Sequence, residues 1–266
     1  FNCSYAWHYA DLPPIGIWQS VYIENKCDVE IDSPFISTVS HETGTLDLSV
    51  DLKAASDDIV VSGMLTGTIR PKNFEGSAYS FSYGVSADAP GDTNVRLRFD
   101  LPEFRLWWPN GTGEQNLYVL ETFFTDENGT TVSTTDQFAV RSLKLTSGVK
   151  AESASTYNRT VVINGRSVFM KGAGWCTIDA AMDFSEENYD KILSRAHEQG
   201  LNFLRAWGGG LVETDIFYEL CDKYGICVYQ EWPCCWDSQK TQPKEALYEC
   251  VRLNTIQNEY AIIPLL

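Results

Sequence analysis

Hydrophobic and polar residues alternate along the first half of the chain in short runs that are typical of β-strands. From Leu46 to Leu52, every second residue is Leu or Val and the residues between them are Asp or Ser. This two-residue period places the apolar side chains on one face of a sheet and the polar ones on the other. Gly, Pro, Asn and Asp separate six such runs, at 46–52, 59–65, 79–85, 95–99, 117–124 and 137–145. Several short strands without a helical pattern between them predict a β-sandwich.

The pattern changes after Thr146, where predicted strands and helices begin to alternate. A short apolar run, Val168–Met170, leads into Gly-Ala-Gly-Trp and precedes a helix predicted between Ser185 and Gly200. The apolar residues of that helix recur at helical spacing, at Tyr189, Ile192, Leu193 and Ala196. Further elements are predicted in the order strand, helix, strand, helix, strand, at 201–207, 214–225, 226–230, 244–256 and 262–266.

Alternation of this kind predicts a parallel sheet, and four such units match the first half of a (β/α)8 TIM barrel. Half a barrel leaves its first and last strands, at Val168 and Ile262, with unpaired backbone groups. Either another polypeptide completes the barrel, or the sequence is part of something longer, or the sheet stays open. The expected fold class is therefore multidomain, with a β-sandwich followed by an α/β half barrel.

Composition and charge narrow the function classes. The chain has 266 residues, a formal net charge of -16 and 44% hydrophobic residues, which is enough apolar material for a packed core. The acidic charge argues against nucleic acid as a partner, because phosphate binding needs a basic face. No apolar run approaches the roughly 18 residues of a membrane span, so we expect no transmembrane segment.

Cysteines and glycosylation sequons point to an oxidising compartment. The chain has 8 Cys and only 3 His, in no zinc-binding pattern, so no metal and no cofactor is expected. Four Asn-x-Ser/Thr sequons are candidate glycosylation sites, at Asn2, Asn110, Asn128 and Asn158. These features predict a secreted, lysosomal or vacuolar glycoprotein with some disulfides, although buried cysteines also serve as small core residues. The chain starts at Phe1 with no visible signal peptide, so processing has removed one or the sequence is a piece of a longer protein.

Five segments carry distinctive motifs, at Ile15–Glu24, Trp107–Tyr118, Val168–Trp175, Arg205–Gly210 and Glu213–Trp232. In order and type these segments resemble glycoside hydrolase family 2 and, within it, the β-mannosidase branch. The resemblance implies a jelly-roll sugar-binding domain, an immunoglobulin-like sandwich and a TIM barrel. On that template the domains are the end of the jelly roll at 1–24, the sandwich at 25–146, a linker at 147–160 and the first half of the barrel at 161–266.

A retaining glycosidase needs two carboxyl groups roughly 5 Å apart, one as acid/base and one as nucleophile. In the family that this chain resembles, the acid/base Glu follows an Asn at the end of the fourth barrel strand, and the nucleophile comes from the seventh. Asn258-Glu259 imitates the first motif but precedes the predicted fourth strand. We therefore expect Glu259 to be a solvated residue at a helix end, with catalysis as the alternative, and no catalytic residue in this sequence.

The resemblance does imply residues of the pocket wall. Arg205 matches the arginine that bonds the nucleophile, with a surface ion pair as the alternative. Trp207 matches a sugar-stacking platform, and Trp175 and Asp179 match residues that line the −1 sugar subsite, with plain structural roles as the alternatives. Glu231 is expected to hydrogen-bond residues around the sugar rather than to act as a catalytic carboxylate.

Two functions follow from these expectations. The first is a truncated, non-catalytic member of the β-mannosidase family, acting as a secreted structural or glycan-binding subunit. The alternative is a fragment of an active retaining exo-β-mannosidase that hydrolyses terminal β-linked mannose. The expected partners are a carbohydrate and another polypeptide that completes the half barrel.

Overall fold

The computed structural model describes residues 27–32, 34–147, 159–176, 178–179, 182–207 and 213–231, together with residues 17, 20, 21 and 23. Two compact units divide the chain, and each is described by itself. The first, the sandwich unit, contains residues 21–107 and 116–142, and the second, the α/β unit, contains residues 1–20, 108–115 and 143–266. The predicted helix at 244–256 and strand at 262–266 lie outside the described residues, as does nearly all of the predicted jelly-roll remnant.

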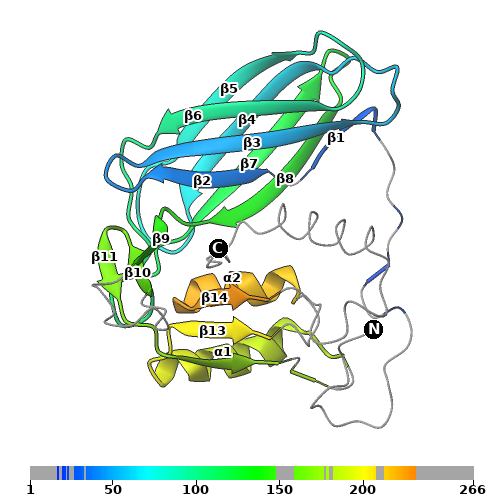
Figure 1. Cartoon of the computed structure of the whole chain (residues 1–266). Coiled ribbons are helices and arrows are strands. Elements are labelled where there is room, and N and C mark those ends of the chain that lie inside the picture. Colours follow the sequence, from blue (N-terminus) through cyan, green and yellow to red (C-terminus); the bar gives the residue numbers. More distant parts are fainter. Residues whose placement is uncertain are drawn as a thin grey trace. The chain divides into compact units, whose positions relative to one another are not determined.

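Two antiparallel sheets form the described sandwich (Figure 1). One contains β1 (Val29–Ile31), β2 (Phe35–Ser40), β3 (Thr45–Ala54) and β6 (Thr93–Asp100). The other has the order β5 (Tyr79–Ser86), β4 (Ser62–Pro71), β7 (Tyr118–Asp126) and β8 (Thr131–Phe138). Most of the predicted strands are confirmed here, and the structure adds β1, β2 and β8.

The sandwich core forms because the two-residue period of β3 is strict. Leu46, Leu48, Val50 and Leu52 are at most 1% exposed. They pack in one cluster with apolar side chains of the other sheet, including Leu65, Ile69, Leu120 and Phe124. The residues between them face outward, as the alternation of a strand requires. This sandwich therefore has a continuous apolar core between its sheets.

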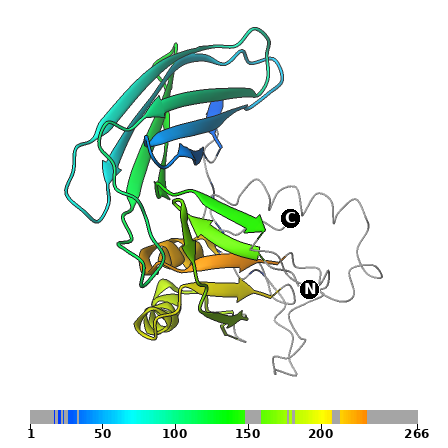
Figure 2. The same cartoon turned by 60° about the vertical axis from the view of Figure 1, so that its left-hand side comes forward.

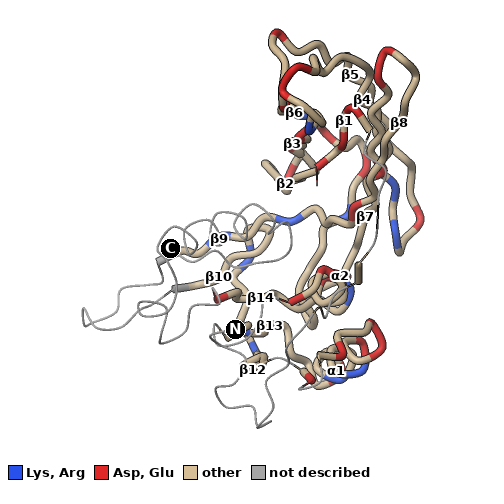
Figure 3. Tube along the Cα trace, turned by 90° about the vertical axis from the view of Figure 1, so that its right-hand side faces the viewer, with Lys and Arg blue, Asp and Glu red and all other residues tan. Residues whose placement is uncertain are grey.

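The described part of the α/β unit contains a parallel sheet in the order β12 (Gly172–Trp175), β13 (Phe203–Ala206) and β14 (Cys227–Gln230). Helices α1 (Glu186–Glu198) and α2 (Asp215–Tyr224) connect these strands and lie on the same side of the sheet (Figure 3). The first two of the three predicted helices are thus confirmed. Gly225 ends α2 in the left-handed conformation, with φ 70°, where glycine carries no steric penalty. Ser185 and Thr214 occupy the N-cap positions, but neither side chain makes a capping hydrogen bond.

A small antiparallel sheet joins β9 (Leu143–Ser147), β10 (Arg159–Ile163) and β11 (Arg166–Val168) within the same unit (Figure 2). Its strands occupy both ends of the predicted linker, whose residues 148–158 are not described. The predicted strand at 137–145 is wrong, because β8 ends at Phe138 and β9 begins only at Leu143.

The predicted first barrel strand at Val168–Met170 is also wrong, since the strand is Gly-Ala-Gly-Trp itself, at β12. A Cβ on Gly172 would lie 2.3 Å from the backbone oxygen of Phe203. Glycine is therefore needed for the close approach of β12 to β13, and a strand of small residues leaves no apolar alternation to detect. Among the described helices, none is long and apolar enough to span a membrane.

Candidate functional site

The three parallel strands of the α/β unit end together. Trp175, Ala206 and Gln230 are aligned across the sheet, so the residues that follow each strand lie at one edge. Active sites of (β/α)8 barrels are built from residues at this carboxyl edge. Here the edge carries Cys176, Trp207 and Glu231, together with Arg205.

Arg205 and Glu231 form an ion pair at this edge. The Nε and Nη2 atoms of Arg205 donate to Oε1 of Glu231 at 2.8 and 2.6 Å. The side chains are 51% and 24% exposed, respectively. Leu204 and Ala206, on either side of Arg205 in β13, belong to the core with the helices. Because side chains alternate along a strand, Arg205 projects from the sheet face opposite the helices. The ion-pair alternative for Arg205 is thus present in the structure.

A hydrogen-bonded chain connects this pair to helix α2. The Tyr218 hydroxyl donates to Oε1 of the buried Gln230 at 2.6 Å, and Nε2 of Gln230 donates to the Glu231 carbonyl oxygen at 2.7 Å. Burial raises the pKa of Tyr218, and the negative charge of Glu213 raises it further, so the hydroxyl stays protonated. The backbone that carries Glu231 is therefore fixed from the helix side.

Trp175 lies among the core residues, the structural alternative for this position. It is only 7% exposed, and its ring packs on those of Phe217 and Tyr189. Its indole nitrogen donates to Oε1 of Glu213 at 2.9 Å. In this arrangement the indole face contacts protein side chains, so Trp175 supports the edge from the helix side.

Glu213 was not a candidate from the sequence, yet it is buried, with 9% of the residue exposed. Its other oxygen accepts a hydrogen bond from the Tyr189 hydroxyl. Burial raises the pKa of Glu213, and the hydrogen bonds from Tyr189 and Trp175 oppose that rise. Through these two hydrogen bonds, Glu213 connects the segment that precedes α2 to Trp175 of β12 and to Tyr189 of α1. No sequence signal marks it, because a Glu beside Thr214 and Asp215 looks like an ordinary polar helix start.

Trp207 directly follows β13, and Asp179 lies in the segment between β12 and α1. Trp207 is half-buried, and its backbone N–H donates to the Arg205 carbonyl oxygen at 3.1 Å. Oδ2 of Asp179 accepts from the backbone N–H of Asp183 at 2.9 Å, which closes the turn at Met182, where φ is 65°. Glu259 lies outside the described residues, so its role stays a prediction.

No disulfide is present at the four described cysteines, Cys27, Cys176, Cys221 and Cys227. Burial raises the pKa of the Cys176 thiol, and the positive charge of Arg205 opposes that rise. Cys3, Cys234, Cys235 and Cys250 lie outside the described residues, so disulfides there remain predictions. Within the described part of the chain, no group of His, Cys, Asp and Glu could hold a metal ion.

The sequons are placed differently. Asn128 is exposed in the turn between β7 and β8. Asn110 is half-buried, and its Nδ2 donates to the carbonyl oxygens of His197 and Leu201 at 2.7 and 3.0 Å. Asn2 and Asn158 lie outside the described residues.

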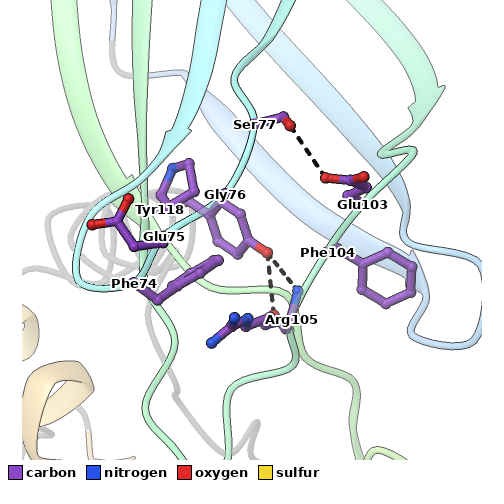
Figure 4. Close-up of a pocket in the computed structure, with 9 residues that line it drawn as sticks. Phe74, Glu75, Gly76, Ser77, Glu103, Phe104, Arg105 and Tyr118 are labelled. Carbon is purple, nitrogen blue, oxygen red and sulfur yellow. Dashed lines mark hydrogen bonds between the residues drawn. The ribbon is translucent and has the colours of Figure 1, made fainter.

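A concavity in the sandwich has a volume of about 160 Å³ (Figure 4). The Arg105 guanidinium lies over the Phe74 ring, 5.0 Å from its centroid. The backbone N–H of Arg105 donates to the Tyr118 hydroxyl at 2.7 Å. These contacts join Arg105 to Phe74, between β4 and β5, and to Tyr118 at the start of β7.

Comparisons with a family model, with curated proteins and with solved structures all find glycosyl hydrolases. Residues 29–141 match the family model described as glycosyl hydrolases family 2. Beta-mannosidase B of Aspergillus terreus is 28% identical over 91% of this chain and 28% of that protein. Beta-mannosidase of Rattus norvegicus is 28% identical over 96% of this chain and 30% of that protein. The crystal structure of a β-D-mannosidase from Dictyoglomus thermophilum superposes with a TM-score of 0.68 at 26% identity, over 89% of this chain and 29% of that one. The chain spans less than a third of the length of these relatives.

Proposed function

Because this chain belongs to glycosyl hydrolases family 2 and is β-mannosidase-like, we propose that it supplies one wall of a binding site for terminal β-linked mannose. The wall is the carboxyl edge of β12, β13 and β14. In this proposal the three strands open a (β/α)8 barrel whose fourth unit is formed by residues 244–266. The barrel is completed by further chain or by another polypeptide.

The ion pair of Arg205 with Glu231 carries the proposal. A guanidinium is a planar donor that binds carboxylates in two-point fashion, and here it projects from the sheet face that a barrel would turn inward. Glu231 fixes its orientation while about half of the arginine side chain remains exposed. Arg205 can therefore hold a catalytic carboxylate supplied from elsewhere in the barrel, and Trp207 beside it can stack on a sugar ring.

The 266 residues by themselves are proposed to be non-catalytic. A retaining mechanism needs one carboxyl group as acid and a second as nucleophile, roughly 5 Å apart. The described carboxylates near the edge are engaged otherwise: Glu231 with Arg205, Glu213 with Trp175 and Tyr189, and Asp179 with its own turn. Alone, the chain would act as a structural or glycan-binding subunit in a secreted or lysosomal setting.

The alternative, that this chain is a fragment of an active exo-β-mannosidase, is favoured by one observation. The similarity to β-mannosidases extends over more than nine-tenths of the chain, across both compact units. An active enzyme of which this is one part would use the same wall for the same sugar.

Turnover of a chromogenic β-mannoside tests these proposals. The assay compares the 266-residue polypeptide with the longest natural polypeptide that contains it, each identified by intact mass. The longer protein should turn over the substrate, and Arg205→Ala in it should reduce kcat/KM by at least 100-fold, whereas Arg96→Ala on the sandwich should not. An unchanged rate in the Arg205 variant would remove this residue from the site. Inactivity of the longer protein would leave the structural role as the function.

A further inference from the structure

Two sequons of this chain have the same three residues, Asn-Gly-Thr, at 110–112 and 128–130. Their local chemistry is identical, so only the fold distinguishes them. Asn128 is exposed, and the backbone of its turn is held by Asp126, whose Oδ1 accepts from the N–H groups of Asn128 and Thr130. That turn leaves the Asn128 side chain directed to solvent.

Asn110 instead contacts the ends of both helices of the α/β unit, to which residues 108–115 belong. Its side-chain amide donates to His197 in the last turn of α1 and to Leu201 just beyond it. Its backbone N–H donates to the carbonyl oxygen of Gly225, the C-cap of α2, at 2.8 Å. The last carbonyl groups of a helix have no partner one turn further on, so donors from outside the helix can bond them, and the His197 carbonyl oxygen accepts from both the Gly200 N–H and Asn110.

The surroundings of Asn110 are shaped to this contact. The Thr112 hydroxyl donates to the Pro109 carbonyl oxygen at 2.6 Å, and Nε2 of Gln115 donates to the Trp108 carbonyl oxygen at 3.0 Å. On the other side, a Cβ at Gly225 would lie 2.5 Å from the Asn110 backbone nitrogen. The loop is therefore internally fixed and fits closely against the end of α2.

We propose that Asn110 is a cap for the ends of α1 and α2 and not a glycan acceptor, and that Asn128 is the glycan acceptor of the sandwich. A glycan replaces one hydrogen of Nδ2 and adds bulk that belongs on an exposed surface. Both hydrogens of Asn110 are engaged by carbonyl oxygens, so a glycan there would break one bond and displace the loop. This inference reverses what the Asn110 sequon suggests and is independent of the proposed function.

Melting temperatures of the full chain test the cap. Asn110→Ala should lower Tm by about 5 °C, because two partly buried hydrogen bonds are lost. Asn110→Asp should lower Tm further, since it places a carboxylate oxygen against two carbonyl oxygens. Asn128→Ala and Asn128→Asp are the matched controls and should leave Tm within about 1 °C. Equal stability of Asn110→Asp and Asn128→Asp would overturn the cap.

Intact mass after expression in a secreting host tests the acceptor. Thr112→Val removes the sequon at 110 but retains Asn110, so its glycan mass should equal that of the parent chain. Asn128→Gln should lose the mass of one glycan. A glycan found on Asn110 in the folded protein would overturn the inference, as would loss of glycan mass in Thr112→Val. If the host attaches no glycan at either position, the assignment of Asn128 as acceptor fails. The Tm values of the Asn110 and Asn128 variants then decide whether Asn110 caps the helices.

Discussion

In the sandwich, the core joins two sheets through Leu, Val, Ile and Phe side chains, and Asn116 and Thr122 are the buried polar side chains among the described residues. The α/β unit buries the carboxylates of Glu213 and Asp222 together with Gln230 and two asparagines. Burying a carboxylate is unfavourable unless hydrogen-bond donors contact it. At Glu213 the Trp175 indole and the Tyr189 hydroxyl are these donors. The described sandwich core is thus almost wholly apolar, whereas the α/β unit buries carboxylates whose hydrogen bonds join β12, α1 and the segment before α2.

The largest expected effect comes from the apolar core of the sandwich. Leu48→Ala should lower the free energy of unfolding by about 3–5 kcal/mol, because a fully buried side chain is removed and a cavity is left. Chemical denaturation measures this change. Val39→Ala, at a position 48% exposed in the same sheet, is the control and should cost less than about 1 kcal/mol. Similar costs at both positions would contradict the description of this core.

A smaller loss is expected at the buried carboxylate. Glu213→Ala should lower the free energy of unfolding by about 2–3 kcal/mol, because the Trp175 indole and the Tyr189 hydroxyl lose their acceptor. The near-ultraviolet circular dichroism of the tryptophans should change as well. Glu127→Ala on the sandwich surface serves as control. A Glu213→Ala chain with parental stability would show that the polar network does not hold this unit together.

The contributions of Glu213 in the α/β unit and Asp47 in the sandwich to stability should change with pH in opposite directions. Burial raises the pKa of Glu213 above 4.5, so the folded chain binds the proton more tightly and the contribution of Glu213 to stability falls as pH rises through and above that value. In the sandwich, the hydrogen bond from Arg98 lowers the pKa of Asp47 below 3.8, so its contribution is present above that pH and is lost on acidification.

Melting curves between pH 3 and pH 7 measure the difference. The Tm of Glu213→Gln relative to the parent should rise with pH, and that of Asp47→Asn relative to the parent should fall. Parallel pH profiles for the two variants would contradict this assignment.

The smallest effect on stability is expected at the candidate site itself. Arg205 and Glu231 are partly exposed, so Glu231→Gln should change the free energy of unfolding by less than about 1 kcal/mol. Its expected effect is on function, through the orientation of Arg205. In the longer protein, Glu231→Gln should lower the rate with a chromogenic β-mannoside at unchanged Tm. A large loss of stability would mean that the pair is structural.

Sequence patterns predict the regular parts of both units well. The alternation of β3 and the apolar spacing of α1 each report a buried face directly, because one side of each element meets a core. Such patterns fail where small or polar residues form a strand, as at Gly-Ala-Gly-Trp in β12 and at the Ser- and Thr-rich β8.

Site residues are harder to predict, because their roles depend on distant partners. Glu213 meets Trp175 from 38 positions away, and Asn110 meets His197 from 87 positions away. The resemblance to glycoside hydrolases indicated Arg205 and Glu231, and the structure brings these two together. Nothing in the sequence distinguishes a sequon in an open turn from one that caps two helices.

Size fractionation followed by a β-mannosidase assay tests whether the wall formed by β12, β13 and β14 can act without further chain. A chromogenic β-mannoside is assayed across the fractions, and intact mass identifies the protein in each. No turnover is expected in the fraction that contains only the 29.9 kDa polypeptide and its glycans, and activity should be confined to heavier species that contain this chain. Turnover by the 29.9 kDa polypeptide alone would contradict the claim that these residues form a wall of the site without its catalytic carboxylates.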